Sequence, residues 1–248
     1  MKLEQFWAEQ PEAAIAFSGG VDSAYLLYSA VRSGARVKAY YAKTAFQPDF
    51  ELEDARKLAS WLGVRMEILP LDVLDVPHVA ENPENRCYYC KRALFSAITR
   101  KARADGFALL LDGTNASDQV SDRPGMRALE ELSVRSPLRE CGLTKAEIRR
   151  RSRQAGLFTH DKPAYACLAT RIPAGEPITA EKLRRTEAAE SFLMELGLRD
   201  FRVRSRGDAA LIQVTQGDVQ TVLDHREEIT ARLKRDYCSV MLDLEVRP

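Results

Sequence analysis

The stretch AIAFSGGVDS, Ala14–Ser23, is the most informative part of this sequence about its fold. Its apolar first half predicts a buried strand, and apolar residues at helical spacing follow it as far as Gly34, a typical helix C-cap. The predicted helix therefore begins directly at the end of the predicted strand. Because parallel α/β sheets bind their ligands at this strand end, the stretch predicts a binding site as well as a fold.

The loop between this strand and this helix is suited to an anion. Two glycines let the backbone approach a ligand closely, two serines supply hydroxyl donors, and the free amides of the helix N-terminus point at the same place. Asp22 would repel a phosphate there unless it holds a magnesium ion or makes a catalytic contact. The candidate nucleotide-binding residues of the loop are Ser18, Gly19, Gly20, Val21, Asp22 and Ser23. A turn that merely needs glycine is the simpler alternative, but it would not explain the acid and the serines.

The sequence contains no GxxxxGK[ST] motif, which excludes the phosphate loop of ordinary kinases and GTPases. Strands and helices alternate along residues 1–171. Further strands are predicted at 37–42, 64–71 and 107–111, and further amphipathic helices at 50–62 and 91–104. This alternation predicts an α/β fold with a doubly wound parallel sheet.

The composition changes after Arg171, where IPAGEP (Ile172–Pro177) resembles a linker. Beyond it the pattern predicts helices at 180–196 and 217–233 and strands at 201–206, 209–215 and 240–246. We therefore expect two domains, a larger α/β domain at 1–171 and a smaller α/β domain at 172–248.

The composition is that of an ordinary globular protein, with 45% hydrophobic and 29% charged residues. A net charge of +1 gives no electrostatic reason to expect nucleic acid or a membrane as partner. No apolar run approaches the roughly 20 residues of a membrane span. The five cysteines are an odd number without an export signal, so we expect reduced thiols and a cytoplasmic protein.

Three cysteines lie in polar stretches that contain Arg, Lys or Tyr. Cys87 and Cys90 form a CxxC in ENRCYYCK, and Cys167 lies in ACLATR; both stretches are expected to be loops. A zinc site has a poor fourth ligand in His160, and a thioredoxin-type pair belongs to the start of a helix in a different fold. The CxxC alone leaves metal or cluster binding and a dithiol equally open. The isolated Cys141 and Cys238 are interpreted as packing.

SGGVDS after a buried strand resembles the PP-loop of the ATP pyrophosphatase superfamily, whose members cleave ATP between the α and β phosphates. Two further segments fit this superfamily: LDGTNASD (Leu111–Asp118) and SPLRECGLTKAEIR (Ser136–Arg149). The first adds Gly113 and Asp118 to the expected nucleotide site. In the second, Thr144 and Glu147 read as the N-cap and capping box of a helix.

Together with ENRCYYCK, KPAYACLATRIPAGEPIT (Lys162–Thr179) and FRVRSRG (Phe201–Gly207), these segments resemble the ATP-dependent sacrificial sulfur transferase family LarE. The resemblance covers nearly the whole chain. It implies that ATP adenylates a carboxylate of pyridinium-3,5-biscarboxylic acid mononucleotide and that sulfur then displaces AMP. The resulting thiocarboxylate belongs to the nickel-pincer nucleotide cofactor of lactate racemase.

The resemblance also implies roles for individual residues. Asp22 and Cys167 would be catalytic, and Cys167 would either donate its own sulfur or join Cys87 and Cys90 in holding a [4Fe-4S] cluster that relays sulfide. The substrate phosphate would be bound by Arg202, Arg204 and Arg171, of which the first two face one side of a predicted strand. Arg171 would act either near the cysteine or near the substrate. The domain at 1–171 would bind ATP and adenylate the substrate, and the domain at 172–248 would bind substrate and support oligomerisation. The cofactors would be ATP, Mg²⁺ and the cluster. A homo-oligomer such as a hexamer is implied, and the sulfide source stays open.

Three other functions compete with this interpretation. A tRNA-thiolating enzyme also joins a PP-loop to cysteines, but the balanced charge and the lack of an RNA-binding extension weigh against it. An amide-forming adenylating ligase leaves ENRCYYCK unexplained. A nucleotide sensor without turnover would differ from an enzyme in releasing no pyrophosphate.

Overall fold

The computed structural model describes residues 2–118 and 124–247, and contacts divide the chain into two units. Unit 1 comprises Met1–Val79 and Asn85–Lys162, and unit 2 comprises Ala80–Glu84 and Pro163–Pro248. The chain thus leaves unit 1 at Pro163, earlier than the linker expected at 172–177. Arg149 of unit 1 donates to the carbonyls of His160 and Lys162, both at 2.7 Å, whereas Arg202 of unit 2 donates to the carbonyl of Ala164.

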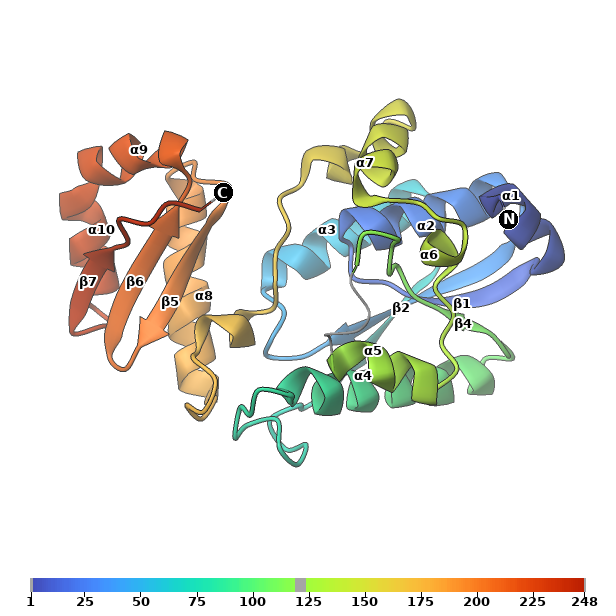
Figure 1. The fold of residues 1–248 in the computed structure, drawn as a ribbon, viewed down its shortest axis with the longest axis horizontal. Coiled ribbons are helices and arrows are strands. Elements are labelled where there is room, and N and C mark those ends of the chain that lie inside the picture. The colour runs from blue at the N-terminus through green and yellow to red at the C-terminus, as the bar shows by residue number, and fades with distance from the viewer. Residues whose placement is uncertain (1, 119–123, 248) are drawn as a thin grey trace. The chain divides into compact units, whose positions relative to one another are not determined.

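Unit 1 contains a parallel sheet with the strand order β3-β2-β1-β4 (Figure 1). The strands are β1 (Glu12–Ala16), β2 (Arg36–Lys43), β3 (Met66–Pro70) and β4 (Leu110–Leu111). The α-helices are α1 (Leu3–Glu9), α2 (Val21–Arg32), α3 (Asp49–Trp61), α4 (Arg86–Ala104), α5 (Pro124–Glu131), α6 (Pro137–Glu140) and α7 (Lys145–Gln154), and the 3-10 helix η1 spans Phe158–Asp161. The predicted α/β fold is confirmed.

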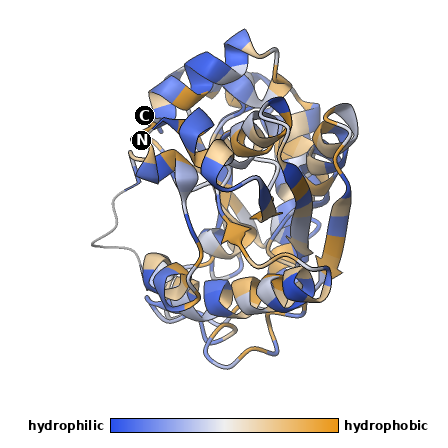
Figure 2. Cartoon of the chain, turned by 90° about the vertical axis from the view of Figure 1, so that its right-hand side faces the viewer, coloured by the Kyte–Doolittle hydropathy of each residue, from blue (hydrophilic) through white to orange (hydrophobic). Residues whose placement is uncertain are grey.

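Helices cover both faces of this sheet because β1 is apolar on both of its sides. Ala13 and Ile15 belong to the core cluster that includes α2 and α3, whereas Ala14 packs with Ile98 and Ala102 of α4 on the other face. All three β1 residues are fully buried. Figure 2 shows hydrophilic residues along the outer sides of the helices of unit 1. The doubly wound arrangement follows from this two-sided strand.

A network of charged side chains fixes the C-terminal end of α4 to the sheet. Lys38 of β2 donates to Asp105 and to Glu67 of β3, both at 2.6 Å, and Lys101 donates to Asp105 at 2.6 Å. The Tyr40 hydroxyl also donates to Asp105, at 2.7 Å. The hydrogen bonds from Lys101, Lys38 and Tyr40 hold the pKa of Asp105 well below its usual range. The ionised carboxylate is therefore favoured by folding.

We expect Asp105→Asn to lower the melting temperature of the protein at pH 7. Because the folded-state pKa is depressed, Asp105 contributes stability above the unfolded-state value of about 3.9, and this contribution is lost as the pH falls through the folded-state pKa. Thermal unfolding at pH 7 and in acid checks this. The difference in melting temperature between Asp105→Asn and the wild type should narrow in acid. Asp208→Asn, which changes an exposed carboxylate, should have the melting temperature of the wild type. A difference for Asp105→Asn that is the same at every pH would contradict the account.

Unit 2 contains the sheet β5-β6-β7, in which β5 and β6 are antiparallel and β6 and β7 are parallel (Figure 1). Its strands are β5 (Phe201–Arg206), β6 (Ala209–Val214) and β7 (Ser239–Leu242). Its helices are η2 (Leu168–Arg171), α8 (Ala180–Glu195), η3 (Gln216–Asp218), α9 (Val219–Asp224) and α10 (Arg226–Leu233). The single helix expected at 217–233 is wrong, because the helical chain is interrupted at His225.

Within the described ranges 2–118 and 124–247, no helix is long and apolar enough to cross a membrane.

Candidate active site

The backbone of the SGGVDS loop requires glycine at position 19, and the loop packs closely against Gly113 from another segment. Gly19 has a φ of +73°, which favours glycine, and a Cβ there would lie 3.0 Å from Cβ of Ala55. A Cβ on Gly113 would lie 2.8 Å from the backbone nitrogen of Ser23. The segment after β4 is therefore pressed against the first turn of α2.

The two serines of the loop are hydrogen-bonded to each other and to the backbone. The hydroxyls of Ser18 and Ser23 are 3.1 Å apart, and Ser23 Oγ donates to the carbonyl of Gly20 at 3.2 Å. Gly20 is the N-cap residue of α2, a helix of 12 residues. The loop is thus held beside the free amides of a long helix, the arrangement that binds phosphate.

A pocket of about 230 Å³ lies at this loop, entirely within unit 1. Its lining residues are Ala16, Ser18, Gly20, Asp22, Ser23, Phe95, Asp112, Gly113, Thr114 and Asp118. Six of the eight residues that the sequence suggests for ATP therefore line one cavity. The other two lie behind it: Gly19 contacts α3, and Val21 is buried in the core.

Asp22 is the pocket's most unusual side chain. Its Oδ2 accepts a hydrogen bond from Lys145 Nζ at 2.6 Å, whereas its Oδ1 is buried and has no hydrogen-bond partner among the described residues. Burial raises the pKa of this carboxyl, and the negative charge of Asp118 raises it further, although Lys145 opposes both. A buried carboxylate oxygen without a partner is costly. The carboxylate fits a hard cation such as Mg²⁺, which binds oxygen ligands.

Lys145 is a residue that the sequence interpretation missed. It is the first residue of α7, its backbone amide donates to Ser117 Oγ at 3.0 Å, and its side chain reaches Asp22. A lysine in the first turn of a helix opposes the helix dipole, so this position is a signal that could have been recognised. Lys145 adds a positive charge to a site built for phosphate.

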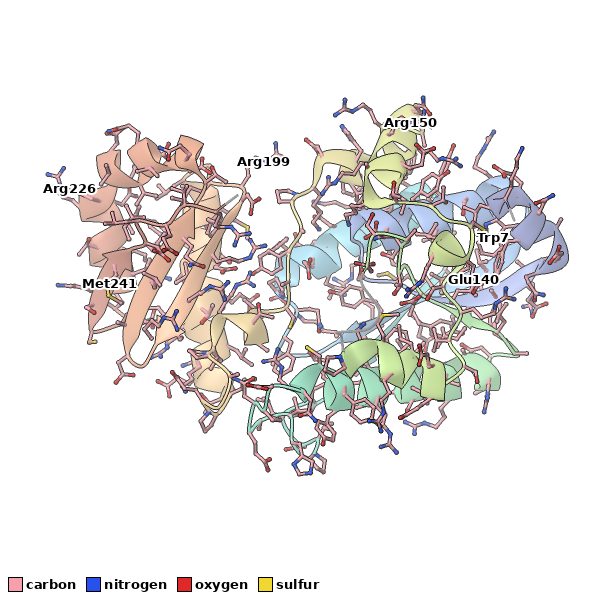
Figure 3. All side chains as sticks on the ribbon, in the orientation of Figure 1. Trp7, Glu140, Arg150, Arg199, Arg226 and Met241 are labelled. Atoms are coloured by element: carbon pink, nitrogen blue, oxygen red, sulfur yellow. The ribbon has the colours of Figure 1, made fainter. Side chains whose placement is uncertain are left out.

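The capping box expected at α7 is only half correct. Thr144 accepts from the Glu147 amide at 3.3 Å and is the N-cap, but the Glu147 carboxylate binds Arg150 and Arg151 instead of the cap amide. The two arginines lie on the same helix face and offer it closer charged partners. Arg150 is exposed on the outer side of α7 (Figure 3).

The loop expected around the CxxC is wrong, because α4 begins at Arg86. Cys87 and Cys90 lie on its first turn, at i and i+3, and therefore on one face. Cys87 is exposed and Cys90 is half-buried, and both belong to unit 1. A helix N-terminus favours thiolates, which suits the pair to metal binding as well as to redox chemistry. Among the residues that the structure describes, no three or more His, Cys, Asp or Glu side chains gather as a metal site.

Cys167 lies in unit 2, as the N-cap residue of η2, and is half-buried. Its carbonyl accepts two hydrogen bonds from Thr170, one from the amide at 2.9 Å and one from the hydroxyl at 2.8 Å. The backbone at this cysteine is thus fixed in a tight turn.

The three arginines expected to bind phosphate lie together in unit 2, but in different surroundings. Arg171 is 1% exposed and forms an ion pair of 2.7 Å with Glu190 of α8. Arg204 is half-buried and donates to the carbonyl of Thr170 at 2.9 Å. Burial and the neighbouring charges of Arg171 and Arg247 lower the pKa of Arg202 to about 10 and also lower that of Arg204. Crowded positive charge of this kind attracts an anion.

Comparison with known proteins identifies the family of this chain. The family model described as asparagine synthase matches residues 7–242. Pyridinium-3,5-bisthiocarboxylic acid mononucleotide synthase of Lactiplantibacillus plantarum is 31% identical over 233 residues, which cover 93% of this chain and 84% of that protein. The chain belongs to the LarE family of PP-loop enzymes. It is therefore an ATP-dependent sulfurtransferase.

Two other relatives of this LarE family member differ in how much of the chain they match. An uncharacterized protein of Synechocystis sp. is 41% identical over 224 residues, which cover 88% of this chain and 82% of that protein. The tRNA-specific 2-thiouridylase MnmA of Thermotoga petrophila is 26% identical over 144 residues, covering 48% of this chain and 40% of that enzyme. The likeness to LarE thus extends over nearly the whole chain, and the likeness to the tRNA-modifying enzyme over half of it.

Proposed function

We propose that this enzyme uses ATP to activate a carboxylate of pyridinium-3,5-biscarboxylic acid mononucleotide and replaces the activated oxygen with sulfur. The observation that carries the proposal is the pocket at the SGGVDS loop of unit 1, which is lined by Asp22 in the first turn of α2. Lys145 donates to one oxygen of this carboxylate, and the other oxygen has no hydrogen-bond partner among the described residues. The substrate is suggested by the name of the Lactiplantibacillus relative and by the crowded positive charge of Arg202 and Arg204 in unit 2.

In the first step, a carboxylate oxygen of the substrate attacks the α-phosphorus of ATP, and the bond from this phosphorus to the bridging oxygen of pyrophosphate breaks. The loop amides and the end of α2 would bind the phosphates, and Lys145 would neutralise charge on the departing pyrophosphate. Asp22 would hold Mg²⁺, with Asp118 beside it, and the metal supplies further charge neutralisation when bound. The product is an acyl adenylate.

In the second step, sulfur attacks the acyl carbon and AMP leaves with the electrons of the broken carbon–oxygen bond. We propose that Cys87, Cys90 and Cys167 hold a [4Fe-4S] cluster, because the helical CxxC supplies two thiols on one face and needs an explanation. Three thiolates leave one iron of such a cluster open to a sulfide ligand, which is the chemistry the cluster supplies when bound.

The alternative second step uses the sulfur of Cys167 itself. Its thiolate forms a thioester with the substrate, the Cα proton is removed, and the Cβ–S bond breaks to leave a thiocarboxylate and dehydroalanine. This route consumes one protein molecule for each sulfur and gives Cys87 and Cys90 no role.

The reaction is tested by incubating the protein with ATP and Mg²⁺ and measuring pyrophosphate. The biscarboxylic mononucleotide should stimulate release strongly, whereas a thiolatable tRNA or a simple amino acid should not. Stimulation by tRNA alone would instead favour tRNA thiolation, and pyrophosphate release without any acid substrate would contradict the assigned substrate. No release under any of these conditions would favour a sensor.

We expect Arg204→Ala to weaken binding of the mononucleotide and leave ATP binding unchanged, because Arg204 belongs to unit 2 and the pocket to unit 1. Loss of one charged hydrogen bond costs about 1.5–3 kcal/mol, which corresponds to a rise of roughly 10- to 100-fold in the KM for the mononucleotide. Steady-state kinetics with each substrate varied in turn measure this. Arg206→Ala, an exposed arginine on the same strand, is the matched control. An effect on ATP alone would contradict the assignment of phosphate to unit 2.

A further inference from the structure

Three guanidinium groups of unit 2 donate hydrogen bonds to the backbone of Ala164–Thr170, here called the Cys167 segment. Arg202 donates to the carbonyl of Ala164, Arg171 to that of Ala166 at 3.0 Å, and Arg204 to that of Thr170 at 2.9 Å. Hydrogen bonds from charged donors are stronger than neutral ones. The backbone on both sides of Cys167 is therefore held by arginines.

Arg171 is the most completely enclosed of the three arginines: it is 1% exposed, Arg202 is also buried at 6%, and Arg204 is half-buried. Its Nε donates to Oε1 of Glu190 at 2.7 Å and its Nη2 to Oε2 at 3.1 Å, and both residues are 1% exposed. The Glu190 carboxylate also accepts from the Val203 amide at 2.9 Å and from the Tyr165 hydroxyl. This carboxylate fixes the guanidinium, and burial leaves Arg171 poorly placed to contact a phosphate.

The remaining nitrogen of Arg171 connects this buried pair to Cys167. Its Nη1 donates to Thr170 Oγ1 at 2.8 Å, and Thr170 Oγ1 donates to the Cys167 carbonyl at 2.8 Å. The Thr170 amide donates to the same carbonyl at 2.9 Å. A continuous series of hydrogen bonds thus runs from Glu190 through Arg171 and Thr170 to the backbone of Cys167.

We propose that Arg171 is a positioning residue for Cys167, acting through Thr170, and that it does not bind the substrate phosphate. The proposal rests on the proposed function, in which Cys167 handles the sulfur. A reacting group must be held close to its productive position, and a displacement of about 1 Å can lower a rate by about 100-fold. The hydrogen bonds described here fix this cysteine through its backbone.

Separate rates for adenylation and for sulfur transfer distinguish a positioning role of Arg171 from a role in substrate binding. We expect Arg171→Gln to leave pyrophosphate release and its KM for the mononucleotide unchanged, and to lower the rate of thiocarboxylate formation by about 100-fold. Arg171→Lys should rescue little of this rate, because one ammonium cannot replace the planar set of bonds to Glu190, Ala166 and Thr170. A raised KM for the mononucleotide in pyrophosphate release would overturn the proposal in favour of a direct phosphate contact.

Amide hydrogen exchange gives a readout that needs neither ATP nor the mononucleotide, so it judges the proposal even if the proposed reaction fails. Arg171→Gln should raise exchange in the peptide that covers the Cys167 segment by at least about tenfold and leave unit 1 unchanged. Arg185→Gln is the matched control: Arg185 is a buried arginine of α8 that donates to the carbonyl of Gly207, outside the segment.

Thr170→Val keeps the proposal testable if Arg171→Gln fails to fold, because it leaves the ion pair with Glu190 in place. It should also raise exchange in the Cys167 segment and slow thiocarboxylate formation, with pyrophosphate release intact. Unchanged amide exchange in Thr170→Val would overturn the proposal. Amide exchange that rises equally throughout unit 2 in Arg171→Gln and Arg185→Gln would show that Arg171 has a merely structural role. Local loosening without slower sulfur transfer would also overturn the proposal, while leaving the proposed function standing.

Discussion

Asp22→Asn should reduce mononucleotide-dependent pyrophosphate release by roughly 100- to 1,000-fold, the range found when one electrostatic contact to a reacting group is removed. The amide keeps the shape of the side chain but cannot neutralise Mg²⁺, and it loses the ion pair with Lys145. Burial makes the charged form costly in the free protein, so the fold does not depend on that charge. Circular dichroism should show an intact fold.

Two companion variants make this result specific. Glu147→Gln removes a carboxylate of α7 that pairs with Arg150 and Arg151 outside the pocket, and its rate should be unchanged. Lys145→Met should slow pyrophosphate release while leaving the Asp22 carboxylate in place. Normal release by Asp22→Asn would mean that the SGGVDS pocket is not where ATP is cleaved.

The second large effect concerns the three cysteines. Protein purified without oxygen should show iron–sulfur absorption that is lost in Cys87→Ala, Cys90→Ala and Cys167→Ala alike, because a cubane held by two thiolates is not retained. Cys238→Ala removes an exposed thiol outside the set and should keep the absorption. Iron and acid-labile sulfide analysis measures how much iron and sulfide each protein molecule holds.

Mass spectrometry of the protein after turnover distinguishes the two sulfur routes. The cluster route leaves Cys167 intact through many turnovers. The single-use route converts it to dehydroalanine, a loss of about 34 Da, the mass of hydrogen sulfide. Absence of iron–sulfur absorption from the wild-type protein, together with this loss, would contradict the cluster and assign the sulfur to Cys167.

Much of the fold was predictable because its signals are local. β1 is apolar on both sides, and the glycines after it occur where the chain must turn sharply and pass close to Ala55. The strands β5 and β6 also lie where their alternating residues predicted them. Such patterns depend only on residues that are neighbours in sequence.

The parts that sequence reasoning missed depend on contacts between distant segments. Lys145 becomes a site residue only when α7 is placed beside α2, a separation of more than a hundred positions. Arg171 resembles an exposed charge in ACLATR until Glu190 buries it. The run ENRCYYCK looked like a loop because it is polar and lacks an apolar repeat, although α4 begins at Arg86, its third residue, and packs its apolar face further along.

The central claim, ATP-dependent transfer of sulfur to a mononucleotide carboxylate, is tested most directly by the mass of the product. The reconstituted protein, ATP, Mg²⁺ and sulfide should convert the biscarboxylic mononucleotide to a species heavier by the difference between sulfur and oxygen, with one AMP and one pyrophosphate formed for each replacement. Recovery of the mononucleotide with its mass unchanged, under conditions where ATP and the cluster are present, would contradict the account.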